Sequence, residues 1–403
     1  MAKDPLAALV RCALACCLGW VGCGAEAAQD SIPIGLILSY SGDLAANSVN
    51  SERALLMAIE AANRSGGVDG RKVALIARDT RSDPRKASAP TRELIAAGAA
   101  LFIGPDTTEL AVELKGLLGN RTVILPSFTT ADASIYKPQS WFLMGATAGR
   151  VACELFAQLR TDGRTNPMVI ADPNGYNSLL AYELTRAYGM VRVTLPAEQS
   201  SNESKVQPIV AVGADAYVLA ALPPAASALL YTMVATGALG DPARWYLSPT
   251  LHTPALLDTI PKGMLTGARG IATGTVAGAN DFRQSFVERW DDTALDDAYS
   301  FYDAGAIAVL ALQRALTQEG SIPPESGLGK HVIAVTQASG TPVLWNQLDQ
   351  GLRLLREGKE VGYVGLTGAL EFDVAGQTRT AHTSWWTISP NGFDPVASHS
   401  DCR

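Results

Sequence analysis

The feature of this sequence that most restricts its fold is an alternation of short apolar runs and helical patterns, which occurs twice. In the first half, strand-like and helix-like segments alternate at residues 32–38, 52–63, 73–77, 85–98, 99–103, 109–118 and 122–125. This spacing predicts a parallel, doubly wound sheet. The same order restarts at residues 168–171, 178–188, 191–195, 206–211, 216–220, 225–236 and 245–247. Because 403 residues are also too many for one core, we predict two α/β lobes.

Loops at the carboxyl ends of the predicted strands are the expected ligand-binding region, because doubly wound sheets bind ligands there. In the first half these loops are residues 39–43, 104–108 and 126–130. Two further helices are predicted later in the chain, at residues 302–316 and 345–356.

The first 30 residues are predicted to be an export segment. An uncharged apolar run at 12–22 has the length of a signal-peptide core and is too short to span a bilayer. It ends at Cys23 in a sequence that resembles a bacterial lipobox, so Cys23 is a predicted lipidation site. The alternatives are cleavage after Ala27 at an A-x-A site, or a buried N-terminal helix. Either export reading places the mature chain in an oxidising compartment.

Charge and motif content argue against several function classes. The net charge of −7 and the pI of about 5.2 make nucleic acid and anionic membranes poor partners. No nucleotide-binding, hydrolase or zinc-protease motif is present, so we expect no enzyme and no cofactor. The four histidines lack metal-ligand spacing, and no metal site is predicted. The acidic pairs 291–292 and 296–297 could form a Ca²⁺ site, but we expect a solvated loop.

Five segments in order resemble the branched-chain amino-acid-binding proteins of bacterial ABC importers. They are residues 57–73, a helix and its glycine turn; 79–84 and 102–108, two strand-end loops; 301–304; and the glycine turn 365–373. The resemblance implies the type 1 periplasmic binding fold, with two doubly wound lobes joined by three crossovers.

Crossovers are expected near residues 146–150, 271–275 and 365–373. The first lobe would then comprise residues 31–146 plus 275–366. The second would comprise residues 147–274 plus 367–403.

The resemblance also implies which residues bind a ligand. In this family the first lobe holds a ligand carboxylate by backbone N–H groups and hydroxyls, and the matching positions are Thr108, Ser127 and Thr129. Tyr176 matches an aromatic residue of the second lobe, and Tyr302 is a further candidate for the cleft wall. The hydroxyls could instead cap helices or turns, Tyr176 could be a surface residue, and Tyr302 could pack at the hinge.

Two departures from the family bear on the ligand. The acidic residue that binds the ligand ammonium falls on Thr250, and a desolvated ammonium needs a carboxylate or several carbonyls. Asn47 replaces an aromatic residue of the first loop, and the loop 221–224 is apolar. We therefore expect a small carboxylate with an apolar or aromatic body, and no tight binding of leucine, isoleucine or valine.

Cysteine usage predicts one disulfide. Without the export segment the chain keeps Cys153 and Cys402, and two cysteines in an oxidising compartment are often paired. The family resemblance places both in the second lobe. The alternative is that Cys153 is a small core residue and Cys402 a free thiol.

Together these features predict an exported solute-binding protein. It would trap a small polar or carboxylate-bearing ligand between two lobes and deliver it to the permease of an ABC importer. It would be a periplasmic monomer, held to the membrane only by a lipid on Cys23. The alternative is a sensory or regulatory ligand-binding protein of the same fold without a transporter; an enzyme has no support beyond the cleft itself.

Overall fold

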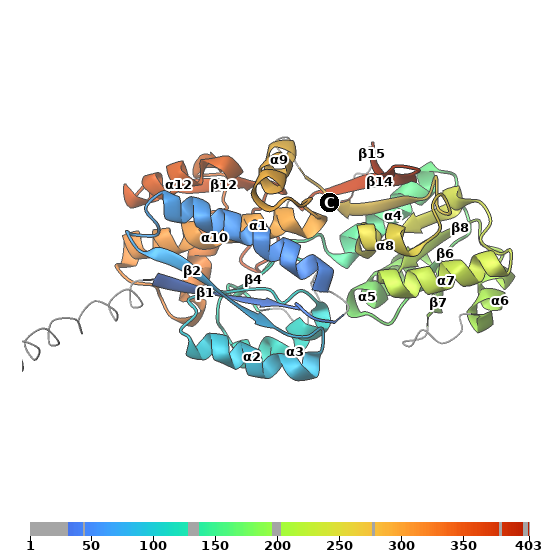
Figure 1. Cartoon of the computed structure of the whole chain (residues 1–403), viewed down its shortest axis with the longest axis horizontal. Coiled ribbons are helices and arrows are strands. Elements are labelled where there is room, and N and C mark those ends of the chain that lie inside the picture. The colour runs from blue at the N-terminus through green and yellow to red at the C-terminus, as the bar shows by residue number, and fades with distance from the viewer. Residues whose placement is uncertain are drawn as a thin grey trace, which may run out of the picture.

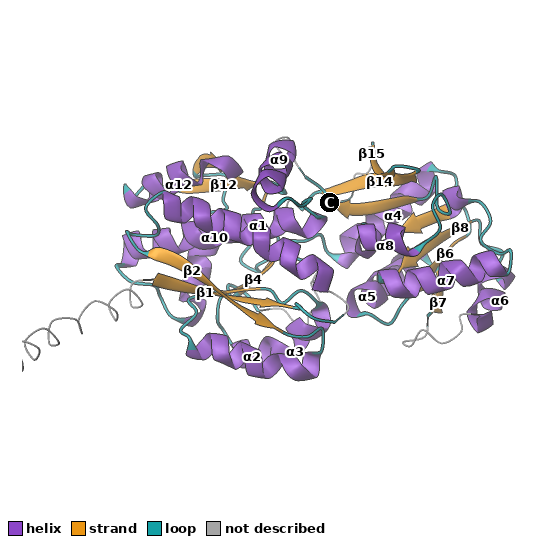
Figure 2. Cartoon of the chain, in the orientation of Figure 1, coloured by secondary structure: helices purple, strands orange, loops and turns teal. Residues whose placement is uncertain are grey.

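The predicted two-lobed α/β architecture is confirmed by a computed structural model, which describes residues 31–42, 45–127, 137–195, 203–275, 279–378, 381–397 and 402 (Figure 1). Helices cover both faces of the main sheet in each lobe (Figure 2). Cys23 lies outside the described residues. No helix within the described ranges is long and apolar enough to cross a membrane.

The main sheet of the first lobe has five parallel strands in the order β2-β1-β3-β4-β5. They are β1 (Ser31–Leu38), β2 (Lys72–Asp79), β3 (Phe102–Ile103), β4 (Val123–Leu125) and β5 (Trp141–Leu143). Alternate side chains of β1 lie on opposite faces of the sheet, since Leu36 and Leu38 belong to one core cluster and Ile37 to the other. Helices α1 (Ala45–Arg64) and α10 (Asp296–Glu319) cover the first face, and α2 (Pro84–Ala96) and α3 (Thr108–Leu118) the second.

A small sheet and shorter helices complete the first lobe. The sheet has the order β11-β12-β13, with β11 (Thr341–Leu344), β12 (Val361–Gly365) and β13 (Gly368–Ala369). The helices are α9 (Ala279–Trp290), α11 (Gly329–Ala334) and α12 (Leu348–Arg356). Their apolar residues join the core cluster of α1 and α10.

The sheet of the second lobe has seven strands in the order β15-β14-β10-β9-β8-β6-β7. Five are parallel: β6 (Pro167–Ala171), β7 (Val191–Thr194), β8 (Ala216–Ala220), β9 (Trp245–Leu247) and β10 (Arg269–Thr273). Two antiparallel strands, β14 (Thr383–Ser389) and β15 (Gly392–Val396), close one edge. Trp385 and Trp386 of β14 are buried in opposite core clusters, on the two faces of this sheet.

Helices of the second lobe divide between the same two core clusters. One cluster contains α4 (Ala148–Thr161) and α5 (Gly175–Tyr188). The other contains α6 (Glu203–Ala211), α7 (Pro223–Ala235) and α8 (Pro254–Thr259).

The third crossover lies later in the chain than the expected 365–373. Gln377 still forms a bridge to Leu143 of the first lobe, and Thr378 pairs with Phe372. The second lobe resumes at Thr383, the first residue of β14. The first lobe therefore extends beyond the expected boundary at residue 366. The sequence did not predict this extension, because isolated bridges carry no apolar pattern.

Helix α10 begins at Asp296, six residues before the predicted start at residue 302. Its first turn carries Asp296 and Asp297, and acidic residues are favourable there because the helix dipole is positive at that end. The apolar pattern begins only at Ala298, so periodicity alone could not include Asp296 and Asp297 in the helix. The two aspartates consequently belong to a helix terminus and not to the expected solvated loop.

Asp303 connects two of the segments that carried the family resemblance. Its buried carboxylate accepts hydrogen bonds from the Tyr363 hydroxyl (2.7 Å), the Leu366 N–H (2.9 Å), and both the N–H (2.9 Å) and hydroxyl (2.7 Å) of Thr367. A Cβ atom on Gly365 would lie 2.4 Å from this carboxylate, so the turn needs glycine. These two segments therefore hold each other in place within the first lobe.

A disulfide joins Cys153 of α4 to Cys402, the penultimate residue. The two Cα atoms are 6.0 Å apart and the cysteines are separated by 249 positions in the sequence. The bond ties the C-terminus to a helix of the second lobe.

Candidate functional site

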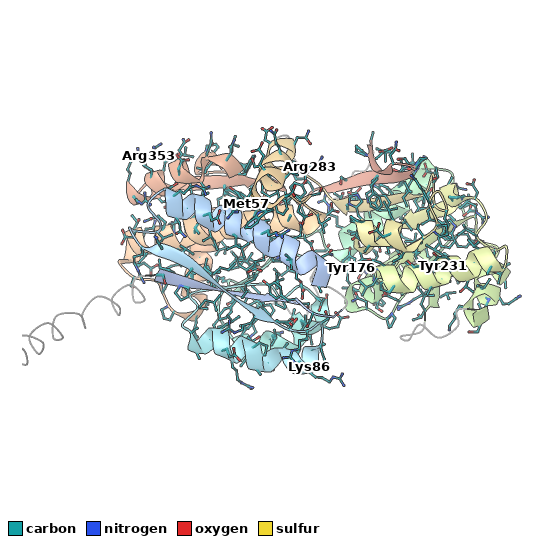
Figure 3. All side chains as sticks on the ribbon, viewed as in Figure 1. Met57, Lys86, Tyr176, Tyr231, Arg283 and Arg353 are labelled. Atoms are coloured by element: carbon teal, nitrogen blue, oxygen red, sulfur yellow. A yellow bond between two sulfur atoms is a disulfide. The ribbon has the colours of Figure 1, made fainter. Side chains whose placement is uncertain are left out.

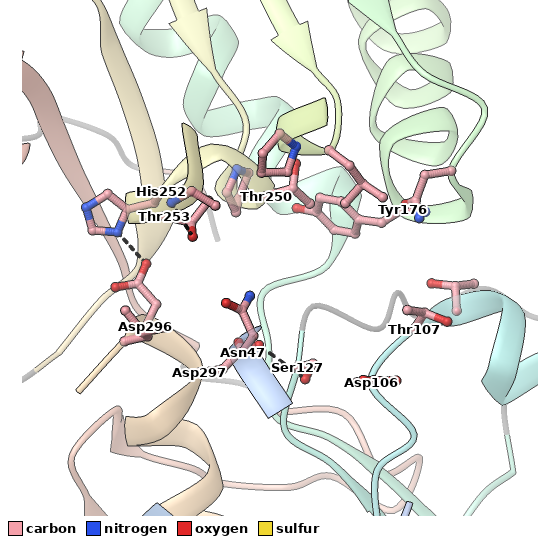
Figure 4. Close-up of a pocket in the computed structure, with 17 residues that line it drawn as sticks. Asn47, Asp106, Thr107, Ser127, Tyr176, Thr250, His252, Thr253, Asp296 and Asp297 are labelled. Carbon is pink, nitrogen blue, oxygen red and sulfur yellow. Dashed lines mark hydrogen bonds and ion pairs between the residues drawn. The ribbon is translucent and has the colours of Figure 1, made fainter. Parts of the chain in front are cut away.

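A cleft lies between the lobes, where the carboxyl ends of their strands meet (Figure 4). The first lobe contributes the start of α1, the loop after β3, Ser127 after β4, and the start of α10. The second lobe contributes the start of α5 and the loops after β8 and β9. The lining residues are Asn47, Asp106, Thr107, Thr108, Ser127, Asn174, Tyr176, Leu222, Pro223, Pro249, Thr250, His252, Thr253, Ala255, Leu295, Asp296 and Asp297.

Four of the six predicted ligand-binding residues line this cleft: Thr108, Ser127, Tyr176 and Thr250. Thr129 lies outside the described residues. Tyr302 does not line the cleft. Its hydroxyl donates to the Trp345 carbonyl (3.0 Å), and its ring packs against Phe282 and Trp345 in the first-lobe core. The prediction failed because Tyr302 lies well inside α10 and not at its start.

Tyr176 lies in the first turn of α5, at the inner edge of the second lobe (Figure 3). Its N–H donates to the side-chain oxygen of Asn174, which caps the helix. The residue is only 4% exposed, and this burial raises the pKa of the hydroxyl well above its ordinary value. Tyr176 therefore offers the cleft a neutral aromatic side chain.

Thr250 is tied into a hydrogen-bond network of the second lobe. Its hydroxyl lies 2.8 Å from the Ala221 carbonyl, 2.7 Å from the Ser248 hydroxyl and 3.1 Å from Oδ1 of Asn177. The network joins the loops after β8 and β9 to α5. Thr250 supplies no charge to the cleft, as the sequence predicted.

Apolar residues form part of the second-lobe wall, which also carries Asn174, Thr250, His252 and Thr253. Leu222 and Pro223 follow β8, Pro249 follows β9, and Ala255 lies in α8. We call these four residues, together with the Tyr176 ring, the apolar wall.

The wall formed by the first lobe is acidic. It carries Asp106, Asp296 and Asp297. None of the cleft-lining residues that the structure describes is a lysine or arginine. This charge disfavours the small carboxylate expected from the sequence, because an anion placed here would meet carboxylates without a compensating cation.

Asp106 is held in place by the loop after β1. Its carboxylate accepts hydrogen bonds from the N–H and the hydroxyl of Ser39, both at 3.0 Å, and from the Ser48 hydroxyl at 3.5 Å. Burial raises the pKa of Asp106 to about 6, and the Ser39 hydrogen bonds oppose that rise. These donors favour the charged form of the carboxylate.

Asp297 is less well compensated. Among the described residues, its hydrogen bond is with the Ser127 hydroxyl at 3.4 Å. Burial, together with the charges of Asp296 and Asp106, raises the pKa of Asp297 to about 7. The charged form of Asp297 is disfavoured by its burial and by the two neighbouring carboxylates. A cation placed next to Asp297 would stabilise that charged form.

The sequence offered one signal for these acidic residues. Two aspartates directly before a run of small and apolar residues are typical of a helix start. Applied to residues 296–311, this rule would have predicted that the helix begins at Asp296. The two aspartates would then have been expected at the carboxyl edge of the sheet, where the cleft lies.

Polar contacts between described residues join the lobes across the cleft. Glu109 of α3 accepts a hydrogen bond from the Gly175 N–H at the start of α5. Asp296 pairs with Nδ1 of His252, which follows β9 and whose ring stacks on Trp386. Each contact therefore joins the first lobe to the second in the arrangement that the structure shows.

Replacing Asp296 with asparagine should shift the ligand-free protein toward an open arrangement. The pair with His252 is partly buried and contributes about 1 kcal/mol, which corresponds to about a fivefold change in the ratio of open to closed molecules. Small-angle scattering should then give a larger radius of gyration. Asp292→Asn is the control, because Asp292 pairs with Arg53 of its own lobe. Equal radii for both variants would contradict the role given to Asp296.

Comparison with known sequences identifies relatives along most of the chain. The sequence profile of a family described as periplasmic binding protein matches residues 31–344. The chain is also similar to the chemotactic signal transduction system substrate-binding protein BasB of Halobacterium salinarum. The two are 25% identical over 370 residues, which cover 84% of this chain and 82% of BasB.

Solved structures share the fold at low sequence identity. The branched-chain amino acid transporter substrate-binding protein LivJ of Streptococcus pneumoniae, in complex with isoleucine, superposes with a TM-score of 0.73 at 16% identity, covering 91% of this chain and 99% of LivJ. An ABC transporter solute-binding protein of R. palustris, in complex with benzoate, gives a TM-score of 0.69 at 13% identity, covering 91% of this chain and 96% of that protein.

Proposed function

Because this chain belongs to the periplasmic binding protein family, we propose that it captures a small polar ligand between its two lobes and delivers it to an ABC importer. The observation that carries the proposal is the cleft, whose walls come from the strand ends of both lobes. A ligand held there contacts both lobes at once and so favours their closure.

The ABC importer is the partner that the resemblance implies, and the solved structures that share the fold include an ABC transporter solute-binding protein of R. palustris. We propose that residues 1–30 direct export to the periplasm, that Cys23 carries a lipid anchor, and that the mature protein acts as a monomer. We expect no chemical turnover of the ligand.

Ligand binding should make the protein more compact. Mass spectrometry of protein purified without refolding would identify the ligand that it carries, which can then be removed by dialysis and added back. The radius of gyration from small-angle scattering should fall on re-addition, because closure about a hinge brings the lobes together. An unchanged scattering profile with a bound ligand would contradict a trapping role.

A sensory role is the second candidate function, and the similarity to the chemotactic protein BasB favours it. A membrane receptor, instead of a permease, would then bind the closed, ligand-bound protein. Genes for a permease and an ATPase beside the gene for this chain would support the importer. Their absence, with binding to a membrane receptor, would support the sensor.

A further inference from the structure

We propose that the cleft selects a small organic ammonium with an apolar body, whose charged group lies between Asp297 and Asp106 of the first lobe. The inference rests on the proposed function, because it assigns the ligand class of the same cleft. In this proposal the carboxylates that bind the ammonium belong to the first lobe, across the cleft from Thr250 of the second lobe.

The shape of the cleft supports this orientation. Behind the cleft, a second, smaller cavity of about 30 Å³ reaches into the first lobe. Asp106, Ser127 and Asp297 line both cavities, and the hydroxyls of Ser48 and Ser51 line the smaller one. A volume of this size holds a group about as large as one water molecule. An ammonium fits that volume and would find carboxylate and hydroxyl oxygens around it.

The opposite wall accounts for the rest of the ligand. The apolar wall of the second lobe faces the acidic wall across the cleft (Figure 4). A hydrocarbon body against it removes apolar surface from water, which is favourable by about 25 cal/mol per Å². A bare metal ion would leave this wall without a partner, whereas an amine with an apolar body contacts both walls.

The charges around Asp297 agree with a cationic ligand. Asp106 and Asp296 are carboxylates, Asn47 and Ser127 are neutral, and His252 is paired with Asp296. An ammonium next to Asp297 would therefore relieve repulsion among three carboxylates. A carboxylate on the ligand would add to that repulsion, so a zwitterion should bind less well than the corresponding amine.

Matched probes of opposite charge test the proposal by calorimetry at pH 8. The pairs are benzylamine with benzoate, and 3-methylbutan-1-amine with 4-methylpentanoate. Leucine completes the set, because it carries both an ammonium and a carboxylate on the branched hydrocarbon chain of the second pair. The amines should bind, the anions should not, and leucine should bind more weakly than 3-methylbutan-1-amine. Asp297→Asn should weaken amine binding about tenfold or more, because the hydrogen bond to a charged group loses its charge.

The matched control is Asp281→Asn, which removes an exposed carboxylate of α9 in the same lobe. It should bind the amines as the unmodified protein does. Melting temperatures without probe establish that both variants are folded. As a second readout, amine affinity should fall from pH 8 to pH 6, because protonation of Asp297 and partial protonation of Asp106 remove negative charge from the site. The fall should be smaller in Asp297→Asn, where only Asp106 still titrates in this range.

Three outcomes would overturn the assignment: binding of an anion at least as tight as that of its amine, unchanged amine affinity in Asp297→Asn, or no binding of either amine. None of them decides the proposed function. A carried ligand of another class that closes the lobes would leave the proposed function standing, whereas a carried ligand that leaves the scattering profile unchanged would contradict it.

Discussion

Reduction of the Cys153–Cys402 disulfide should lower the free energy of unfolding by up to about 5 kcal/mol. The bond closes a loop of 249 residues, and the chain-entropy model gives a value of that order for such a long loop. Urea denaturation with and without reductant measures the difference. The midpoint should shift to a lower urea concentration in the reduced protein.

Serine variants separate the bond from other effects of the reductant. Cys153→Ser, Cys402→Ser and the double variant should lose the same stability, because each removes the same bond. Reductant should then change none of the three. Additive losses, or two free thiols in peptide maps of exported protein, would show that the cysteines are not paired.

Asp303→Ala should destabilise the first lobe by about 3–5 kcal/mol, because the substitution leaves buried donors without an acceptor. Four hydrogen bonds end on this carboxylate, and two of the donors are backbone N–H groups that cannot turn elsewhere. Thermal or urea unfolding measures the loss.

Asp373→Ala is the matched comparison within the same C-terminal turn region. Asp373 accepts hydrogen bonds from the Ala375 and Gln377 N–H groups at 2.8 and 3.0 Å, but it is partly exposed. Water can replace an acceptor there, so the expected loss is about 1 kcal/mol. Equal losses in the two variants would mean that the Asp303 network is not a main support of the lobe.

The sheets could be predicted from the sequence because their strands are buried. Runs such as residues 32–38 and 216–220 are apolar throughout, as buried parallel strands require, and the helices between them carry clear periodicity. The order of these elements was therefore sufficient for the fold class.

The acidic side of the site could not be predicted in the same way. Asp296 and Asp297 precede the apolar pattern of α10, so periodicity alone assigned them to a loop. Their approach to Asp106 depends on the packing of α10 against α1, about 250 positions earlier in the chain. The antiparallel strand β15 was also missed, since Asp394 and Pro395 are unusual in strands and are tolerated at the edge of the sheet.

The discontinuous lobes have a consequence for the timing of folding during synthesis. Gly305 of α10 packs against Leu55 and Ala58 of α1, and β14 pairs with β10 after more than 100 intervening residues. Domains usually fold as units as they leave the ribosome, from the N-terminus onward. Here the first lobe cannot finish folding until residues up to 378 have been translated. The second lobe cannot finish folding until β14 and β15 have been translated. Neither lobe can complete its core before the segments that follow residue 365 have been translated, and Cys402 is translated later than both.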